Sequence, residues 1–470
     1  MGRNRDIAIG FGSLSVVLAA LAFFLFGPAG AGAAAQSGGA AGGGSFVGVA
    51  SCGGTTCHGR SEANPPNGGP PVRQDELMIW QDPASPAGAH SRAYAVLGSP
   101  RSREIARRLG LPNNDAARAP MCLGCHSTPA PQAQRGPRFQ LSDGVGCEGC
   151  HGPAGSWLAS HYAVGGTHSA NVQRGLVPLE NARARANVCL DCHFGSADQG
   201  QFVDHRIMAA GHPRIAFELD LFTTLQQHHS EDSDYHSRKG RPNPVQTWAV
   251  GQAMALERSL SLFATSERGV EGIFPEFYFF DCHSCHRRIS DDPRAEPTMI
   301  ANPGRPIPRG MPPYNDENMI MLSAAARVVS PQLAARFDRD SRAFHAAIAS
   351  DRISAVRAAA ALRDSARALS AAFASSAMGR DQSFAIVEAI TSNAISERFT
   401  DYAGSVQAVM ATDTLLSALV AGGHVTNERA NTIRADINVA YQAVRDPNQY
   451  DPRQFRSALG RAAAAIRRLR

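Results

Sequence analysis

The stretch from residue 121 to residue 153, MCLGCHSTPAPQAQRGPRFQLSDGVGCEGCHGP, determines how the chain can fold, because it contains two Cys-x-x-Cys-His motifs close together. In this pattern two thiols bond covalently to the vinyl groups of one haem, and the histidine that follows ligates the iron. The residues concerned are Cys122, Cys125 and His126, and then Cys147, Cys150 and His151. The stretch therefore predicts two attached haem groups.

The pattern recurs outside this stretch and uses all ten cysteines of the chain. Each second cysteine is followed directly by a histidine, although only 16 of the 470 residues are histidine, so chance is a poor explanation. We expect about five haem c groups. The remaining motif residues are Cys52, Cys57 and His58, Cys189, Cys192 and His193, and Cys282, Cys285 and His286.

Three other uses of paired cysteines fit the pattern less well. Disulfide pairing has no need of a histidine after every second cysteine. A structural zinc site joins two Cys-x-x-Cys pairs, or one pair and two spaced histidines, which does not predict a repeated Cys-His step. A thioredoxin-like dithiol is a single motif on a βαβ unit. Covalent haem attachment remains the interpretation.

The composition describes a folded chain without an affinity for nucleic acid. Hydrophobic residues make up 43% and charged residues 19%, so the chain is not disordered. The formal charge of +5 is small for 470 residues and gives no support to nucleic-acid binding.

The N-terminus has the features of an export segment. Arg3 and Arg5 precede an apolar run, and three alanines before Gln36 offer a cleavage site, so residues 1–35 are interpreted as a signal peptide. The alternative is an uncleaved anchor at residues 8–27, which would give membrane association through the N-terminus. Both alternatives place the rest of the chain outside the cytoplasm, in the periplasm or another extracytoplasmic location. Residues 36–45, rich in glycine, form a flexible linker.

Two further regions follow, and the expected fold class is mainly α. Residues 46–313 hold every motif and are rich in glycine and proline, which predicts a multihaem domain of short helices with little regular strand. Residues 314–470 lack cysteine and repeat helical periodicity, which predicts an antiparallel bundle of four to six helices.

Each iron needs a ligand on its far face, or an open position if it performs chemistry. Eleven histidines lie outside the motif positions, which exceeds the need for five. We expect the ligands between residues 46 and 313 and interpret His345 and His424 as surface residues. His283 could reach a neighbouring iron or be exposed, and one ligand could come from the polar run that contains His228, His229 and His236.

Several segments resemble the cytochrome c-554 family of multihaem cytochromes. The resemblance covers roughly residues 46–290 and implies a largely helical fold around closely spaced haems. It also implies distal ligands at His90 and His161, then at His212, with His205 as a further candidate. The segments are FVG at residue 46, Trp80, HSRAY at residue 90, CLGCH, GVGCEGCHGPAGSW, His161, and AGHPR followed by FEL.

The first motif departs from the family pattern. Four residues separate Cys52 from Cys57, where the family usually has two. A haem there could be held by both thioethers or by Cys57 alone. Five haems is therefore the expectation, and four is the fallback if this motif is not used.

Several haems on one exported chain most simply carry electrons between redox protein donors and acceptors. The alternative is a multihaem oxidoreductase that acts on a small nitrogen compound at one open haem. No Cys-x-x-Cys-Lys motif is present, which a resemblance to pentahaem nitrite reductases would require. Whether the chain is an enzyme depends on whether any iron lacks a distal ligand.

Overall fold

The computed structural model describes most of the chain from residue 44 onward. The predicted export segment at residues 1–35 and most of the predicted linker lie outside the described residues, so both stay predictions. The described residues are 44–62, 73–197, 201–214, 216–265, 274–286, 302, 304–308, 311–396 and 402–470.

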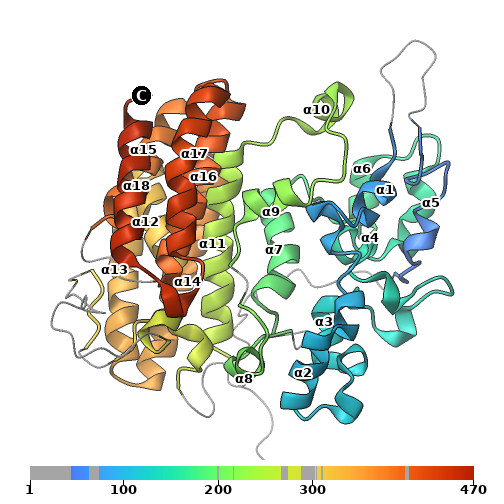
Figure 1. The fold of residues 1–470 in the computed structure, drawn as a ribbon. Coiled ribbons are helices and arrows are strands. Elements are labelled where there is room, and N and C mark those ends of the chain that lie inside the picture. The colour runs from blue at the N-terminus through green and yellow to red at the C-terminus, as the bar shows by residue number, and fades with distance from the viewer. Residues whose placement is uncertain are drawn as a thin grey trace, which may run out of the picture. The chain divides into compact units, whose positions relative to one another are not determined.

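The described residues confirm the expected mainly α fold (Figure 1). Helices account for 64% of the residues that the structure describes, and they comprise eighteen α-helices together with short 3-10 turns. Extended pairing within the described ranges is limited to isolated bridges, such as that between Phe46 and Arg135.

The helices that follow the N-terminal segment are short. Side chains cap several of them at the start, and two of them end at a glycine, Gly152 or Gly240. Ser99 accepts a hydrogen bond from the Ser102 amide at the start of α2, and Asp204 accepts one from Ile207 at the start of α8. The helices are α1 (Glu76–Gln81), α2 (Pro100–Arg108), α3 (Pro120–His126), α4 (Cys147–His151), α5 (Leu158–His161), α6 (His168–Gln173), α7 (Ala182–His193), α8 (His205–Ala209), α9 (Leu219–Leu225) and α10 (Ser233–Lys239).

The later helices are longer, and from α12 onward most helices that are consecutive in the sequence pack against each other, as expected of an antiparallel bundle. The seven helices from α12 onward exceed the predicted four to six, because breaks at residues without glycine, such as Ser330, were not visible in the periodicity. They are α11 (Pro244–Phe263), α12 (Glu317–Val329), α13 (Pro331–Ile348), α14 (Arg352–Ala374), α15 (Arg380–Ala394), α16 (Tyr402–Ala421), α17 (Asn427–Ala443) and α18 (Pro452–Arg467).

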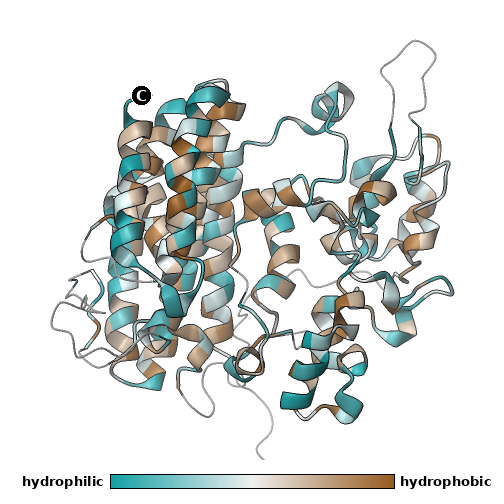
Figure 2. Cartoon of the chain, in the orientation of Figure 1, coloured by the Kyte–Doolittle hydropathy of each residue, from teal (hydrophilic) through white to brown (hydrophobic). Residues whose placement is uncertain are grey.

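Helix α11 is buried along its whole length and organises the main core. It packs against α7 and α9 as well as α12, α14 and α16. Trp248 and Phe263 on this helix are fully buried, in one hydrophobic cluster with Phe279 and the bundle helices. Figure 2 shows that apolar residues gather where the long helices face one another and that their outer faces are hydrophilic. The boundary proposed near residue 313 stays a prediction.

Helix α16 is the one described helix that is long and apolar enough to cross a membrane. However, 72% of its apolar window is buried inside the protein. Such burial is typical of a core helix, and the packing of α16 against α11, α12, α15 and α17 accounts for its composition.

A chain of buried amides joins the bundle to the segment before α9. Gln252 donates to Gln407 (3.1 Å), and Gln407 donates to the carbonyl oxygen of Phe217 (2.9 Å). Thr414 donates to Glu218 (2.9 Å), the residue that caps α9. These bonds satisfy polar groups that would be costly to bury alone, and they fix the position of the Phe217 segment.

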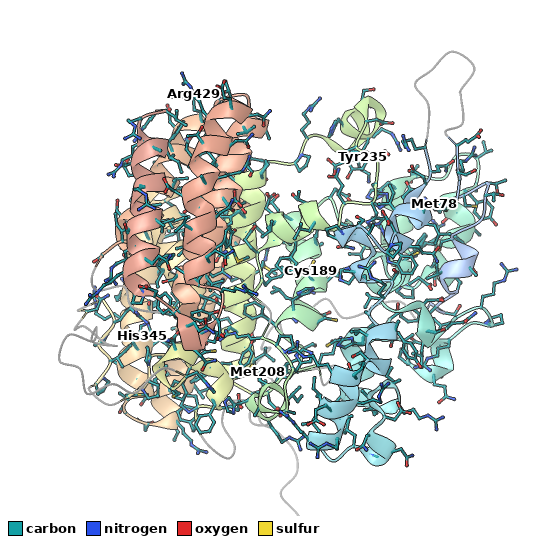
Figure 3. The ribbon with its side chains drawn as sticks, viewed as in Figure 1. Met78, Cys189, Met208, Tyr235, His345 and Arg429 are labelled. Atoms are coloured by element: carbon teal, nitrogen blue, oxygen red, sulfur yellow. The ribbon has the colours of Figure 1, made fainter. Side chains whose placement is uncertain are left out.

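One surface assignment from the sequence is wrong. His345 is 2% exposed, and its Nε2 lies 3.3 Å from a carboxylate oxygen of Asp316, which is equally buried. The position on α13 faces the core, which periodicity alone did not distinguish for a polar residue (Figure 3).

Candidate haem-binding sites

Three of the five motifs end a helix. α3 ends at His126, α4 at His151 and α7 at His193. Residues at positions i, i+3 and i+4 share one face of a helix, so the two thiols and the imidazole of each motif lie on the same side. The first motif follows the 3-10 turn Val49–Ser51, and the fifth begins the turn Cys282–Ser284.

Motifs that are distant in sequence adjoin in space. Helix α7, which carries Cys189 (Figure 3), packs against α3 and α4. The fifth motif connects to the others through Arg214, which donates to the Cys282 thiol (3.6 Å) and lines a pocket beside Cys192 and His193. The thiol neighbours from different motifs are Cys52 with Cys147, Cys125 with Cys192, and Cys150 with Cys189.

Each motif histidine faces a second histidine from outside the motifs. The distances between ring centroids fall in a narrow range, from 5.8 to 6.3 Å. We call these five contacts the histidine pairs. They are His58 with His161 (6.1 Å), His126 with His212 (6.2 Å), His151 with His229 (5.8 Å), His193 with His90 (6.3 Å) and His286 with His205 (6.3 Å).

The partner histidines come from different elements. The structure brings all four residues that the sequence singled out, His90, His161, His205 and His212, next to a motif histidine. Their role as ligands stays a prediction. The remaining pair, at the third motif, is completed by His229. The sequence did not distinguish His229 from the two other histidines of its polar run.

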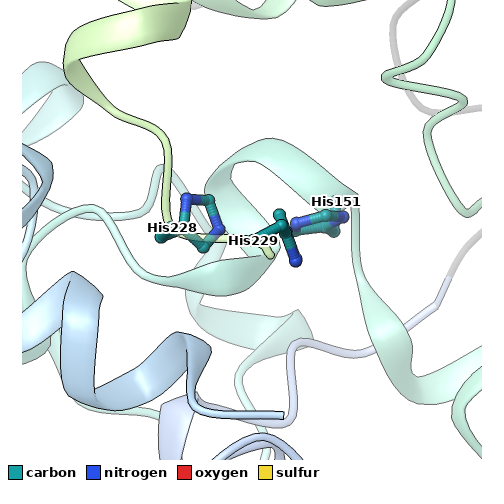
Figure 4. Close-up of side chains that lie close together, drawn as sticks. All are labelled: His151, His228 and His229. Atoms are coloured by element: carbon teal, nitrogen blue, oxygen red, sulfur yellow. The ribbon is translucent and has the colours of Figure 1, made fainter. Parts of the chain in front are cut away.

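The surroundings of His151 explain that ambiguity. The ligand atoms of His151, His228 and His229 lie within 4.8 Å of one another, and the rings of His228 and His229 are 4.2 Å apart (Figure 4). The polar run contains α10, and both histidines lie close to His151 of α4. The two adjacent histidines were the feature of the sequence that could have pointed to a ligand at this position.

The pair distances fit an iron between the rings. A bond from a metal to an imidazole nitrogen is about 2 Å long, and the ring centre lies about 1 Å further, so two rings on opposite sides of one metal stand about 6 Å apart. All five pairs meet this distance. A structural zinc site would need four ligands, and the described residues contain no such group with cysteine.

Backbone contacts set the tautomer of several rings. Nδ1 of His126 donates to the carbonyl oxygen of Ala93 (2.8 Å), and Nδ1 of His212 donates to that of Pro213 (2.8 Å). Because a carbonyl oxygen only accepts, the proton is on Nδ1, and Nε2 keeps its lone pair. That is the form that binds a metal.

Burial keeps other rings of the pairs neutral at pH 7. Burial, with smaller contributions from nearby histidines, lowers the pKa of His151 to about 3. Burial and then the neighbouring His90 lower the pKa of His193 to about 4. A neutral imidazole is the ligating form, so these rings need lose no proton to bind iron.

One carboxylate contacts two of the pairs. Nδ1 of His58 donates to one oxygen of Glu76 (3.0 Å), and Nδ1 of His229 lies 3.4 Å from the other. Burial alone would raise the pKa of Glu76, but the hydrogen bonds to His229 and His58 outweigh it and hold the pKa well below its usual range. Glu76 is therefore a charged acceptor at neutral pH.

Aromatic side chains hold three other rings in place. Phe217 and Phe222 contact His193, with centroid distances of 5.6 and 5.1 Å. Trp157 packs edge-on against His161 (5.7 Å), and Phe277 against His205 (5.3 Å). Such contacts restrict the rotation of a ligand ring and exclude water from it.

His283, inside the fifth motif, is occupied by a different contact. Its Nδ1 donates to the carbonyl oxygen of Pro447 (2.7 Å), and its ring packs edge-on against Tyr450 (5.0 Å). The side chain therefore attaches the fifth motif to the segment before α18.

Glu148, between the cysteines of the third motif, pins the first residues of the fold. Its carboxylate is buried and accepts hydrogen bonds from three backbone amides, those of Val47 (2.9 Å), Gly48 (2.8 Å) and Ala154 (2.7 Å). The segment before the first motif is thereby fixed to α4.

We predict that Glu148→Gln lowers the free energy of unfolding by about 3 kcal/mol, since a buried N–H that loses its acceptor costs about 1–3 kcal/mol. The amide also turns one donor toward the backbone amides. Urea unfolding of the holo-protein followed by circular dichroism measures the change. Glu104→Gln is the control, because Glu104 lies on the surface of α2 and pairs only with arginines. Equal midpoints for the two variants would contradict the prediction.

The motifs, the thiols and the paired histidines together define a c-type cytochrome, and the comparison with known families agrees. Residues 74–152 match the family described as cytochrome c554 and c-prime. This stretch contains the second and third motifs and His90. The chain is a c-type cytochrome that resembles the cytochrome c-554 family, as its sequence predicted. No curated protein and no solved structure matched the chain.

Proposed function

We propose that the protein is an exported pentahaem cytochrome that carries electrons between redox protein donors and acceptors. The observation that supports the proposal is the set of five histidine pairs. Each motif contributes one ring, and each ring has a partner at the distance that an iron requires. Five sites are favoured over the fallback of four, because His58 of the first motif is paired as the others are.

The chain's own residues would hold the groups. The ten cysteines would provide the thioether bonds, and the ten histidines of the pairs would provide the axial ligands. Haem supplies one-electron transfer at its iron, and two imidazole ligands favour a lower potential than histidine with methionine. The carbonyl oxygens and Glu76 fix the tautomer of four of these imidazoles, and aromatic side chains hold the orientation of three others.

The contacts between motifs suit a carrier. Thiols of the first and third, third and fourth, and second and fourth motifs are neighbours, and Arg214 connects the fourth motif with the fifth. Electron tunnelling falls steeply with distance, so attachment points that lie near one another favour transfer from one site to the next. A single isolated site would not need this arrangement.

The alternative of an enzyme that acts on a small nitrogen compound requires one iron without a distal ligand. Every motif histidine has a histidine partner, so the pairs favour electron transfer over catalysis. Location outside the cytoplasm is part of the proposal and depends on the N-terminal segment, cleaved or retained as an anchor.

The experiment is a haem count combined with low-temperature EPR of the oxidised holo-protein. We expect five haems per chain by pyridine haemochrome, all low-spin. The angles between paired rings predict two signal classes: three nearly perpendicular pairs (81°, 87° and 83°) and two closer to parallel (19° and 37°). The mass of the mature chain reports the haem number again and shows whether residues 1–35 are removed. A stoichiometric high-spin signal would contradict the proposal and favour the enzyme.

A further inference from the structure

Glu76 stands out because one side chain serves two histidine pairs. It lies in the first turn of α1 and is 17% exposed. One of its oxygens accepts from Nδ1 of His58, the motif ligand of the first site, and the other faces Nδ1 of His229, the distal residue of the third site. The two residues are far apart in sequence, so only the fold brings them to one carboxylate.

Among the described residues, no hydrogen bond places a carboxylate on Nδ1 of a histidine in the other three pairs. Nδ1 of His126 and Nδ1 of His212 donate to neutral carbonyl oxygens. Nδ1 of His90 and of His193 are buried without a hydrogen-bond partner. Within the described residues, the hydrogen bonds place a carboxylate on Nδ1 of two pair histidines, His58 and His229, and Glu76 supplies both contacts.

We propose that Glu76 is a positioning residue shared by two haem sites, and that it lowers the reduction potentials of both below those of the other three. This inference rests on the proposed function. A carboxylate on Nδ1 holds the proton there, directs Nε2 toward the metal and makes the imidazole a stronger donor. A stronger donor and a nearby negative charge stabilise the oxidised iron. The first and third sites therefore have the two lowest reduction potentials, and a single side chain lowers both.

The test is a spectroelectrochemical titration of wild-type and Glu76→Gln holo-protein. The amide has one acceptor oxygen where the carboxylate has two, so at least one histidine loses its partner and both lose the charge. Removal of the residue that hydrogen-bonds to a metal ligand typically lowers metal affinity or activity 10-fold or more. We expect the equilibrium constant for one-electron reduction to rise about tenfold at two of the five sites. This corresponds to a rise of about 59 mV in each of those two potentials, and the other three potentials should stay unchanged.

Asp75→Asn is the matched control, because it removes a charge one residue away whose carboxylate contacts Arg73 and neither histidine. It should shift none of the five potentials comparably. An equal shift in both variants, or no selective shift in Glu76→Gln, would overturn the inference. Five low-spin haems in each protein would meanwhile leave the proposed function intact, whereas fewer haems or a high-spin signal in the wild type would contradict that function instead.

The wild-type protein gives a second readout if Glu76→Gln does not accumulate. His58 and His161 are the most nearly parallel pair, with 19° between ring planes, so their site should give the least anisotropic EPR signal. During reductive titration this signal should be among the last two to disappear. If this signal disappeared first, the assignment of a low potential to the sites that Glu76 contacts would be overturned.

Discussion

Replacing His229 with alanine should convert one haem in five from low-spin to high-spin, while His228→Ala should leave all five low-spin. The reason is the pairing: the ring of His229 stands 5.8 Å from that of His151, whereas Nδ1 of His228 donates to the carbonyl oxygen of Gln226 and its ring packs against His229. Low-temperature EPR of the two oxidised variants, purified with their haems, measures the outcome.

The double variant removes the remaining ambiguity. His228 lies close enough to replace its neighbour in the single variant, since the ligand atoms of all three histidines lie within 4.8 Å. A variant without His228 and His229 must therefore show the high-spin signal. A double variant that stays low-spin would place the distal ligand of the third site elsewhere. If His228→Ala gave the high-spin signal and His229→Ala did not, His228 rather than His229 would be the distal ligand of the third site.

The second large effect concerns stability. Phe263→Ala should lower the free energy of unfolding by about 3–5 kcal/mol, because deletion of a buried phenylalanine loses its transfer energy and leaves a cavity. Phe263 on α11 is fully buried and touches four aromatic rings at centroid distances of 5.3 to 5.9 Å. Those rings belong to Phe274, Phe279, Tyr314 and Phe344.

Urea unfolding of the holo-protein, followed by circular dichroism, measures this loss. Ile353→Ala is the control, because Ile353 is 73% exposed and surface substitutions usually change stability by less than about 0.5 kcal/mol. Similar midpoints for the two variants would show that the aromatic cluster contributes little. Phe279 lies three residues before Cys282, so the EPR signal of the fifth site should also broaden in Phe263→Ala.

The sequence predicted the parts of the site that depend on local spacing. The spacing of cysteines and histidine is visible in the sequence itself, so all five motifs were recognisable without tertiary information, and in three of them a helix places two thiols and a ring on one face. The mainly α fold followed from the same local periodicity. The number of later helices did not, because α12 and α13 end without the glycine or Asp-Pro signal that marks the breaks after α14, α16 and α17.

Local sequence patterns could not predict which histidines from distant segments would pair. His90 and His161 were accessible through the resemblance to a known family, but His229 lies in a polar run where three histidines look equivalent. The tertiary contact with His151 distinguishes it. The shared position of Glu76 was equally invisible, because an acidic residue in the first turn of a helix has an ordinary explanation in the helix dipole.

The buried amides that link α9 to the bundle have a consequence for the order in which the molecule is completed during synthesis. A chain emerges from its N-terminus, and all ten paired histidines lie before residue 287. The groups that secure Phe217 and Glu218, namely Gln407 and Thr414, emerge more than a hundred residues later. Every paired histidine is therefore present while the chain is still growing, whereas the position of Phe217 beside His193 is fixed only after α16 has been synthesised.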